Sequence, residues 1–127
     1  MANGNDVVAM AKVVAGAPFG LGGTSKNLEL AIRGEEFEVE EMYSAYITVA
    51  DSQNESAAKQ TFKWALEAEK IHASLFTIAK ERVDRKEDMT IEGEVWICPT
   101  CGHTSIGEAP PEKCPVCGQP GSAYKGF

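Results

Sequence analysis

Positive charge is scarce in this sequence of 127 residues. Twelve lysines and arginines stand against 19 aspartates and glutamates, which gives a formal charge of −7, and the basic residues form no cluster. Nucleic acids and anionic membranes attract proteins through basic patches. We therefore expect neither nucleic acid nor a membrane as a partner.

A long apolar run is also lacking. The most apolar stretch, VVAMAKVVAGAPFGLGG near the N-terminus, is too short to span a bilayer and contains Lys12. It also lacks the basic region of a secretion signal. Residues 1–23 are therefore interpreted as an apolar, glycine-rich segment that is either a short helix or extended, and we expect a cytoplasmic protein.

Cysteine is absent before Cys98. Four cysteines then follow as two Cys-x-x-Cys pairs, in CPTCG and CPVCG, which is typical of metal binding rather than of a secreted disulfide framework. Four thiolates at this spacing suit a tetrahedral ion. The ion is either structural zinc or an iron that carries one electron. The predicted ligands are Cys98, Cys101, Cys114 and Cys117.

Two long helices are predicted in residues 24–88. Helix-forming residues with an apolar stripe run from about Lys26 to Ala50 and again from about Gln53 to Arg82. The stretch DSQNES interrupts the pattern, and Ser52 and Glu55 have capping-box spacing for the second helix. The sequence therefore predicts an αα-hairpin.

Residues 89–127 are predicted to form a second, small domain of short strands and turns. The charged stretch VDRKEDM precedes it, and we put the boundary near Asp88. His103 is expected at the surface rather than among the metal ligands. The residues expected to fill the small core are Trp96, Tyr124 and Phe127.

Acidic residues and a rare histidine are expected to meet inside the hairpin. Glu35 and Glu38 lie about as many residues before the turn as Glu69 and His72 lie after it. Both pairs should therefore sit roughly 25 Å along the hairpin and face each other. Facing carboxylates repel and would become protonated, whereas a metal ion would satisfy all of them. The alternative is an ordinary solvated pair, as we expect for Glu36, Glu40 and Glu41.

One copy of the chain supplies only half of a bundle metal site. Di-iron and di-manganese bundle proteins use a glutamate from each of two helices and a Glu-x-x-His motif from each of the other two. A two-fold axis would turn one glutamate and one Glu-x-x-His motif into two of each. The sequence therefore predicts a homodimer.

Together these features resemble the rubrerythrin family, which combines a ferritin-like di-iron bundle with a C-terminal rubredoxin-like iron site. The resemblance lies in TSKNLELAIRGEEFEVEEMYSAY, ALEAEKIHASLF and the two Cys-Pro-x-Cys-Gly knuckles. The sequence departs from the usual member because it has only the second pair of bundle helices. The implied fold is α plus small β: a ferritin-like four-helix bundle assembled from two chains, one αα-hairpin each, with a rubredoxin-like four-cysteine domain.

The resemblance also implies roles for single residues. Glu35 would be a terminal carboxylate ligand, Glu69 the bridging carboxylate and His72 the histidine ligand. Glu38 looks like the additional glutamate that binds one iron when oxidised and releases it when reduced. Tyr43 is similar to a tyrosine that hydrogen-bonds near these carboxylates, with a core tyrosine at a helix interface as the alternative.

The implied function is a non-haem di-iron peroxidase that reduces hydrogen peroxide to water. A reductase or a rubredoxin-type donor would supply electrons through the thiolate-bound iron. One di-iron site would be shared by the dimer and one thiolate-bound iron held by each chain, with zinc as the alternative there. The competing functions are ferritin-like iron oxidation and storage, redox sensing, and a structural dimer with a zinc ribbon.

Overall fold

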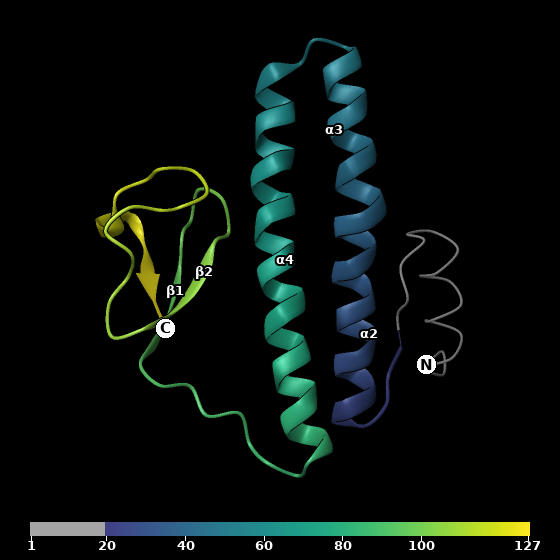
Figure 1. Ribbon diagram of the computed structural model, residues 1–127, viewed down its shortest axis with the longest axis vertical. Coiled ribbons are helices and arrows are strands. Elements are labelled where there is room, and N and C mark those ends of the chain that lie inside the picture. Colours follow the sequence, from purple (N-terminus) through teal and green to yellow (C-terminus); the bar gives the residue numbers. More distant parts are fainter. Residues whose placement is uncertain (1–19) are drawn as a thin grey trace, which may run out of the picture.

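A computed structural model describes residues 20–127, which form a long helical hairpin with a small sheet domain beside it (Figure 1). The first arm consists of α2 (Thr24–Phe37), the π-helical segment η1 (Glu38–Met42) and α3 (Tyr43–Ser52). The second arm is α4 (Ser56–Asp84). The helical region that the apolar stripes predict is confirmed, whereas most of the predicted N-terminal segment lies outside the described residues.

The turn of the hairpin differs from the predicted capping box. Ser52 ends α3, and its hydroxyl donates to the Val49 carbonyl at 2.8 Å instead of capping α4. The N-cap of α4 is Glu55, with no side-chain capping bond. Its backbone N–H donates to the Ala50 carbonyl at 2.8 Å, and Lys59 of α4 is paired with Asp51 of α3 across the same turn.

The π-helical segment was not foreseen. An α-helix follows η1 on one side and precedes it on the other, so the arm stays one continuous rod. A π-helical stretch adds residues to a turn and changes which side chains face the neighbouring helix. Its sequence, EVEEM, contains no glycine or proline that would mark an irregularity.

The sheet domain contains β1 (Glu94–Ile97), β2 (Thr104–Gly107), the 3₁₀ turn η2 (Gly121–Ala123) and β3 (Lys125–Gly126). Both neighbours of the central β1 are antiparallel, in the order β2-β1-β3. The small antiparallel sheet confirms this part of the predicted fold.

The core of the sheet domain surrounds the cysteines. Tyr124 is buried there, and Trp96 packs on the cysteine cluster while its indole N–H donates to the Gly107 carbonyl at 3.0 Å. The prediction for Phe127 is wrong, since its side chain is 75% exposed at the chain end. The prediction for His103 is also wrong: it is only 8% exposed, because it is paired with the Tyr124 hydroxyl.

The helices bury very little by themselves. In the stretch from residue 24 to residue 84 only Ala50 (4% exposed) and Ala68 (3% exposed) are buried. Tyr46 and Val49 remain 45% and 51% exposed although they belong to the apolar stripe. Between residues 20 and 127, no helix combines the length and the apolar character needed to cross a lipid bilayer.

Candidate metal centres

The first candidate centre lies between α2 and α4. One ligand atom each from Glu35, Glu69 and His72 can be chosen so that all three lie within 4.8 Å of one another. The two α4 residues are one helical turn apart, and Nδ1 of His72 is 2.7 Å from Oε2 of Glu69. The antiparallel packing of α2 on α4 therefore brings together three of the residues that the sequence singles out.

Glu38 and Tyr43 border the same group. The pKa of Glu38 is raised, mainly by burial and next by the negative charge of Glu69. Burial and the charges of Glu69 and Glu38 also raise the pKa of Tyr43. The two residues stand at the start of η1 and directly after it, so the π-helical turn sets how both face Glu69. Glu36, Glu40 and Glu41 are exposed, as the sequence predicts.

The charge of this group fits a cation. Burial, followed by a hydrogen bond to Glu69 and repulsion from its charge, raises the pKa of Glu35 to about 7. Clustered carboxylates with an imidazole are the ligand set that bundle proteins use for paired iron or manganese ions. A bound cation would take the place of the proton that the raised pKa leaves on Glu35, and it would balance the repulsion between Glu35 and Glu69.

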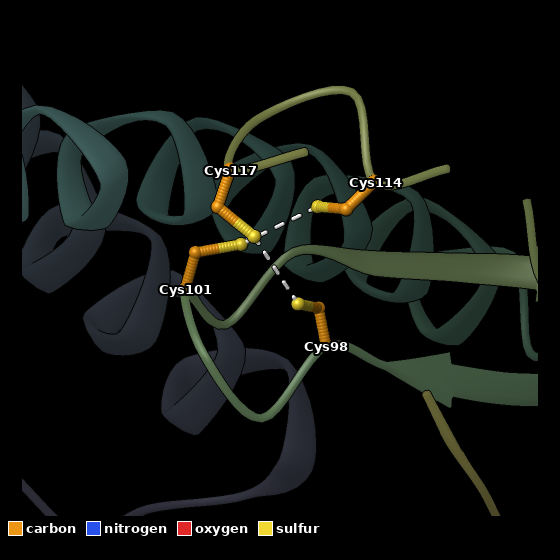
Figure 2. A group of neighbouring side chains, drawn as sticks. All are labelled: Cys98, Cys101, Cys114 and Cys117. Carbon is orange, nitrogen blue, oxygen red and sulfur yellow. Dashed lines mark hydrogen bonds between the residues drawn. The ribbon is translucent and has the colours of Figure 1, made fainter. Parts of the chain in front are cut away.

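The second candidate centre consists of the four cysteines. Their sulfurs lie within 4.8 Å of one another, and Figure 2 shows all four pointing toward a common centre. The Cys98–Cys117 and Cys101–Cys114 sulfur pairs are 3.6 Å and 3.5 Å apart, and all four thiols are free. Metal–sulfur bonds of about 2.3 Å in a tetrahedron put sulfurs roughly 3.8 Å apart. The cluster therefore has the size of a tetrahedral metal site.

Two matching turns build this cluster. The N–H of Gly102 donates to the Cys98 carbonyl and that of Gly118 donates to the Cys114 carbonyl, each at 2.9 Å. Both glycines have a φ of 79°, a conformation in which a side chain would be strained. This requirement explains why a glycine follows the second cysteine of each pair.

Hydrogen bonds around Cys114 favour its thiolate. Burial opposes the charge, but bonds from the Cys117 N–H and the Tyr124 hydroxyl outweigh it and lower the pKa of Cys114 to about 6. The Tyr124 oxygen also lies 2.8 Å from Nδ1 of His103. Cys101 differs, since burial raises its pKa. Sequence reasoning missed this His103–Tyr124 pair, for which the spacing of the residues carries no signal.

Family models match both the helical part of the chain and the part that holds the four cysteines. The rubrerythrin family model matches residues 3–80, and the model of the rubrerythrin rubredoxin-like domain matches residues 96–125. The chain belongs to the rubrerythrin family. The four cysteines lie within the matched rubredoxin-like domain, so the predicted family and the predicted rubredoxin-like domain are confirmed.

Rubrerythrin-2 of Clostridium acetobutylicum is 45% identical over 115 residues, which cover 91% of this chain and 61% of that protein. Nigerythrin of Nitratidesulfovibrio vulgaris is 33% identical over 101 residues, which cover 80% of this chain and 48% of the relative. The chain thus spans about half to three fifths of the length of these rubrerythrin relatives.

Solved nigerythrin structures share the fold. The partially reduced state matches with a TM-score of 0.71 at 28% identity, covering 96% of this chain and 61% of the other. The fully reduced state, all ferrous, matches with the same score. Iron, the cofactor predicted from the sequence, therefore agrees with the rubrerythrin family and with the four-cysteine cluster.

Proposed function

We propose that two copies of this chain form a non-haem di-iron peroxidase that reduces hydrogen peroxide to water. The observation that carries the proposal is the convergence of Glu35, Glu69 and His72 on one side of a hairpin whose α4 also contacts the rubredoxin-like domain. This is half of a bundle di-iron set. A symmetric second chain would supply the other half.

The exposed stripe of the hairpin supports the second chain. Tyr43, Tyr46 and Phe62 form an aromatic cluster with ring centroids 5.3–6.4 Å apart. Beside it is an open hollow of about 490 Å³, which is lined by Tyr46, Val49, Ala50, Gln53, Glu55, Ala58 and Phe62. Apolar side chains of a second hairpin would fill this hollow and complete a four-helix bundle.

Each ligand has a role in the proposed site. Glu35 would hold one iron as a terminal ligand, Glu69 would bridge the pair, and His72 would bind through Nδ1, the nitrogen that faces Glu69. Glu38 would be the additional carboxylate of the oxidised state. When bound, the iron pair supplies Lewis acidity and the electrons for reduction.

The proposed reaction needs electrons from the four-cysteine sites and a fixed position for Glu69. Reduction of one hydrogen peroxide takes up two electrons and two protons and yields two water molecules. The two four-cysteine sites of a dimer would each deliver one electron from a reductase or a rubredoxin-type donor. The raised pKa of Tyr43 keeps its hydroxyl protonated, so that it can hydrogen-bond Glu69 and hold this carboxylate in place. A protein of this kind would work in the cytoplasm.

Iron content, solution mass and turnover test the proposal together. Protein purified without oxygen should contain about two irons per chain, one from the shared pair and one from the thiolate site, and should be a dimer. The Glu69→Ala and His72→Ala variants should lose peroxide turnover and keep the iron–thiolate spectrum. Glu67→Ala is the matched control, because Glu67 lies on the same helix but is paired with Lys70 on the exposed side.

Other results would favour the competing functions. Peroxide turnover that persists in both the Glu69→Ala and the His72→Ala variants would refute the peroxidase assignment. Faster consumption of oxygen with ferrous iron would favour ferritin-like iron oxidation. Zinc in place of iron at the cysteines would favour a structural dimer.

A further inference from the structure

The rubredoxin-like domain reaches the first candidate centre through one side chain. Thr104 is the first residue of β2, and its hydroxyl oxygen lies 3.4 Å from Nε2 of His72. Both side chains are partly buried. The opposite ring nitrogen, Nδ1, faces Glu69, so His72 stands between the two parts of the protein.

The direction of the hydrogen bond follows from a second contact of Thr104. Its hydroxyl donates to the Gly102 carbonyl at 3.1 Å. A hydroxyl has a single proton, so toward His72 the same oxygen can only accept. Nε2 therefore carries a proton, and when a metal ion binds Nδ1 in place of the proton that faces Glu69, the remaining proton of the ring stays on Nε2.

A row of three residues on α4 holds the domain in place. Trp64 packs against the cysteine cluster, and Ala68 lies against Gly102, where an added Cβ would be 3.4 Å from the Ala68 Cβ. His72 is next in the row and meets Thr104. Residues four apart lie on one helix face, so these three side chains form one continuous contact surface for the domain.

We propose that Thr104 is a positioning residue for the di-iron site, which fixes the ring orientation and the proton position of His72 from the rubredoxin-like domain. The inference rests on the proposed function, because His72 must bind metal for the effect to matter. Partners of ligating histidines typically change metal affinity about 10–100-fold. The Gly102 carbonyl that Thr104 binds follows Cys101 directly, so the same bridge links the two metal centres.

Metal binding by four proteins tests this role. Metal-free wild type and the Thr104→Val, Thr104→Ser and Ser105→Ala variants would be titrated with Fe²⁺ without oxygen. Valine keeps the shape of threonine without the hydroxyl, and serine keeps the hydroxyl. Ser105 is the neighbouring control, since its buried hydroxyl has no hydrogen-bond partner in residues 20–127. In parallel, NMR of the zinc-loaded proteins would follow the Nε2–H of His72.

We expect helical-site affinity to fall about 10–100-fold in Thr104→Val and to remain near wild type in the other two variants. The Nε2–H signal should exchange slowly with solvent in the wild type, disappear in Thr104→Val and return in Thr104→Ser. Equal affinity and equal exchange in Thr104→Val would overturn the inference, as would a serine variant that restores neither. Wild-type protein that binds no metal at Glu69 and His72 would instead refute the proposed function itself.

Discussion

Glu35 is the carboxyl group whose acidity the fold changes most clearly. In the metal-free protein its pKa is raised from 4.5 to about 7, mainly by burial. The folded state thus binds this proton more tightly than the unfolded state. The stability that comes from this tighter proton binding is fully present below the unfolded pKa of 4.5. It is lost as the pH rises through the folded pKa of about 7.

We therefore expect the melting temperature of metal-free protein to fall between about pH 5 and about pH 8. The fall should be smaller in Glu35→Gln, which cannot ionise, and smaller in metal-loaded protein, where a cation balances the charge. Circular dichroism melts across this range provide the measurement. An equal slope in Glu35→Gln would show that other groups cause the pH dependence.

The Tyr124 hydroxyl should tune the four-cysteine iron. A hydrogen bond to a cysteine sulfur stabilises the reduced state, which carries more negative charge. Tyr124→Phe removes the hydroxyl that favours the thiolate of Cys114. A hydrogen bond worth about 1 kcal/mol corresponds to roughly 40 mV for one electron, so the reduction potential should fall by about that amount. Spectroelectrochemistry of the red iron–thiolate band measures it, and an unchanged potential would contradict the role.

Single residues were predictable where the chemistry depends on spacing. The Cys-x-x-Cys pairs identify the four-cysteine cluster, because a tetrahedral ion constrains both the ligand type and the distance along the chain. His103 and Phe127 were misjudged for a different reason. Burial in such a small domain depends on one or two contacts, such as the bond from His103 to Tyr124, and these leave no periodic pattern.

At the scale of elements, the π-helical segment η1 separates Glu35 from Tyr43. A π-helical turn holds about one residue more than an α-helical turn, so removing one residue from η1 should restore a regular α-helix and leave the residues on either side on nearly the same faces. Deletion of exposed Glu40 would therefore keep Tyr43 on the side of Glu69 but remove the widened turn in which Glu38 stands.

We expect the Glu40 deletion to keep its helical circular dichroism and its thiolate-bound iron but to bind iron more weakly at the helical site, because Glu38 no longer projects from a widened turn. Metal analysis together with the iron–thiolate spectrum checks this. Glu40→Ala is the control, since it removes the same exposed side chain without shortening the turn. Full iron occupancy after the deletion would mean that the π-helical turn does not set the site.

Helices and their faces were predictable from the apolar stripe, which the 3.6-residue period generates. The π-helical turn was not, because its residues, EVEEM, are ordinary helix formers without a glycine or proline. The expected cap at Ser52 failed for a related reason. Its hydroxyl found a carbonyl within its own helix, which competes with capping the next one.

At the scale of the whole molecule, the proposed dimer depends on the exposed apolar face of α3. Val49→Lys should place a charge in the interface and separate the chains, so that the helical site loses its metal while the four-cysteine site keeps its own. Thr48→Lys is the control, because Thr48 lies on another face of the helix and its hydroxyl is bonded to the Ser44 carbonyl.

Solution mass and iron content of the two α3 variants would be measured side by side. A dimer with full iron content in Val49→Lys would place the interface elsewhere.

The docking of the rubredoxin-like domain on α4 could not be predicted from the apolar pattern of the sequence. Sequence periodicity identifies an apolar face but not what covers it, and the contact of Gly102 with Ala68 joins two small residues that no pattern marks.

The near absence of buried side chains between residues 24 and 84 links folding to concentration. A hairpin whose buried residues are two alanines gains little from folding by itself, so in the proposed dimer the chains would fold as they associate. Dilution would then lower the melting temperature, by mass action. The concentration of active dimer would follow the square of the concentration of free chains, and a cell could switch the activity on steeply through a modest rise in expression.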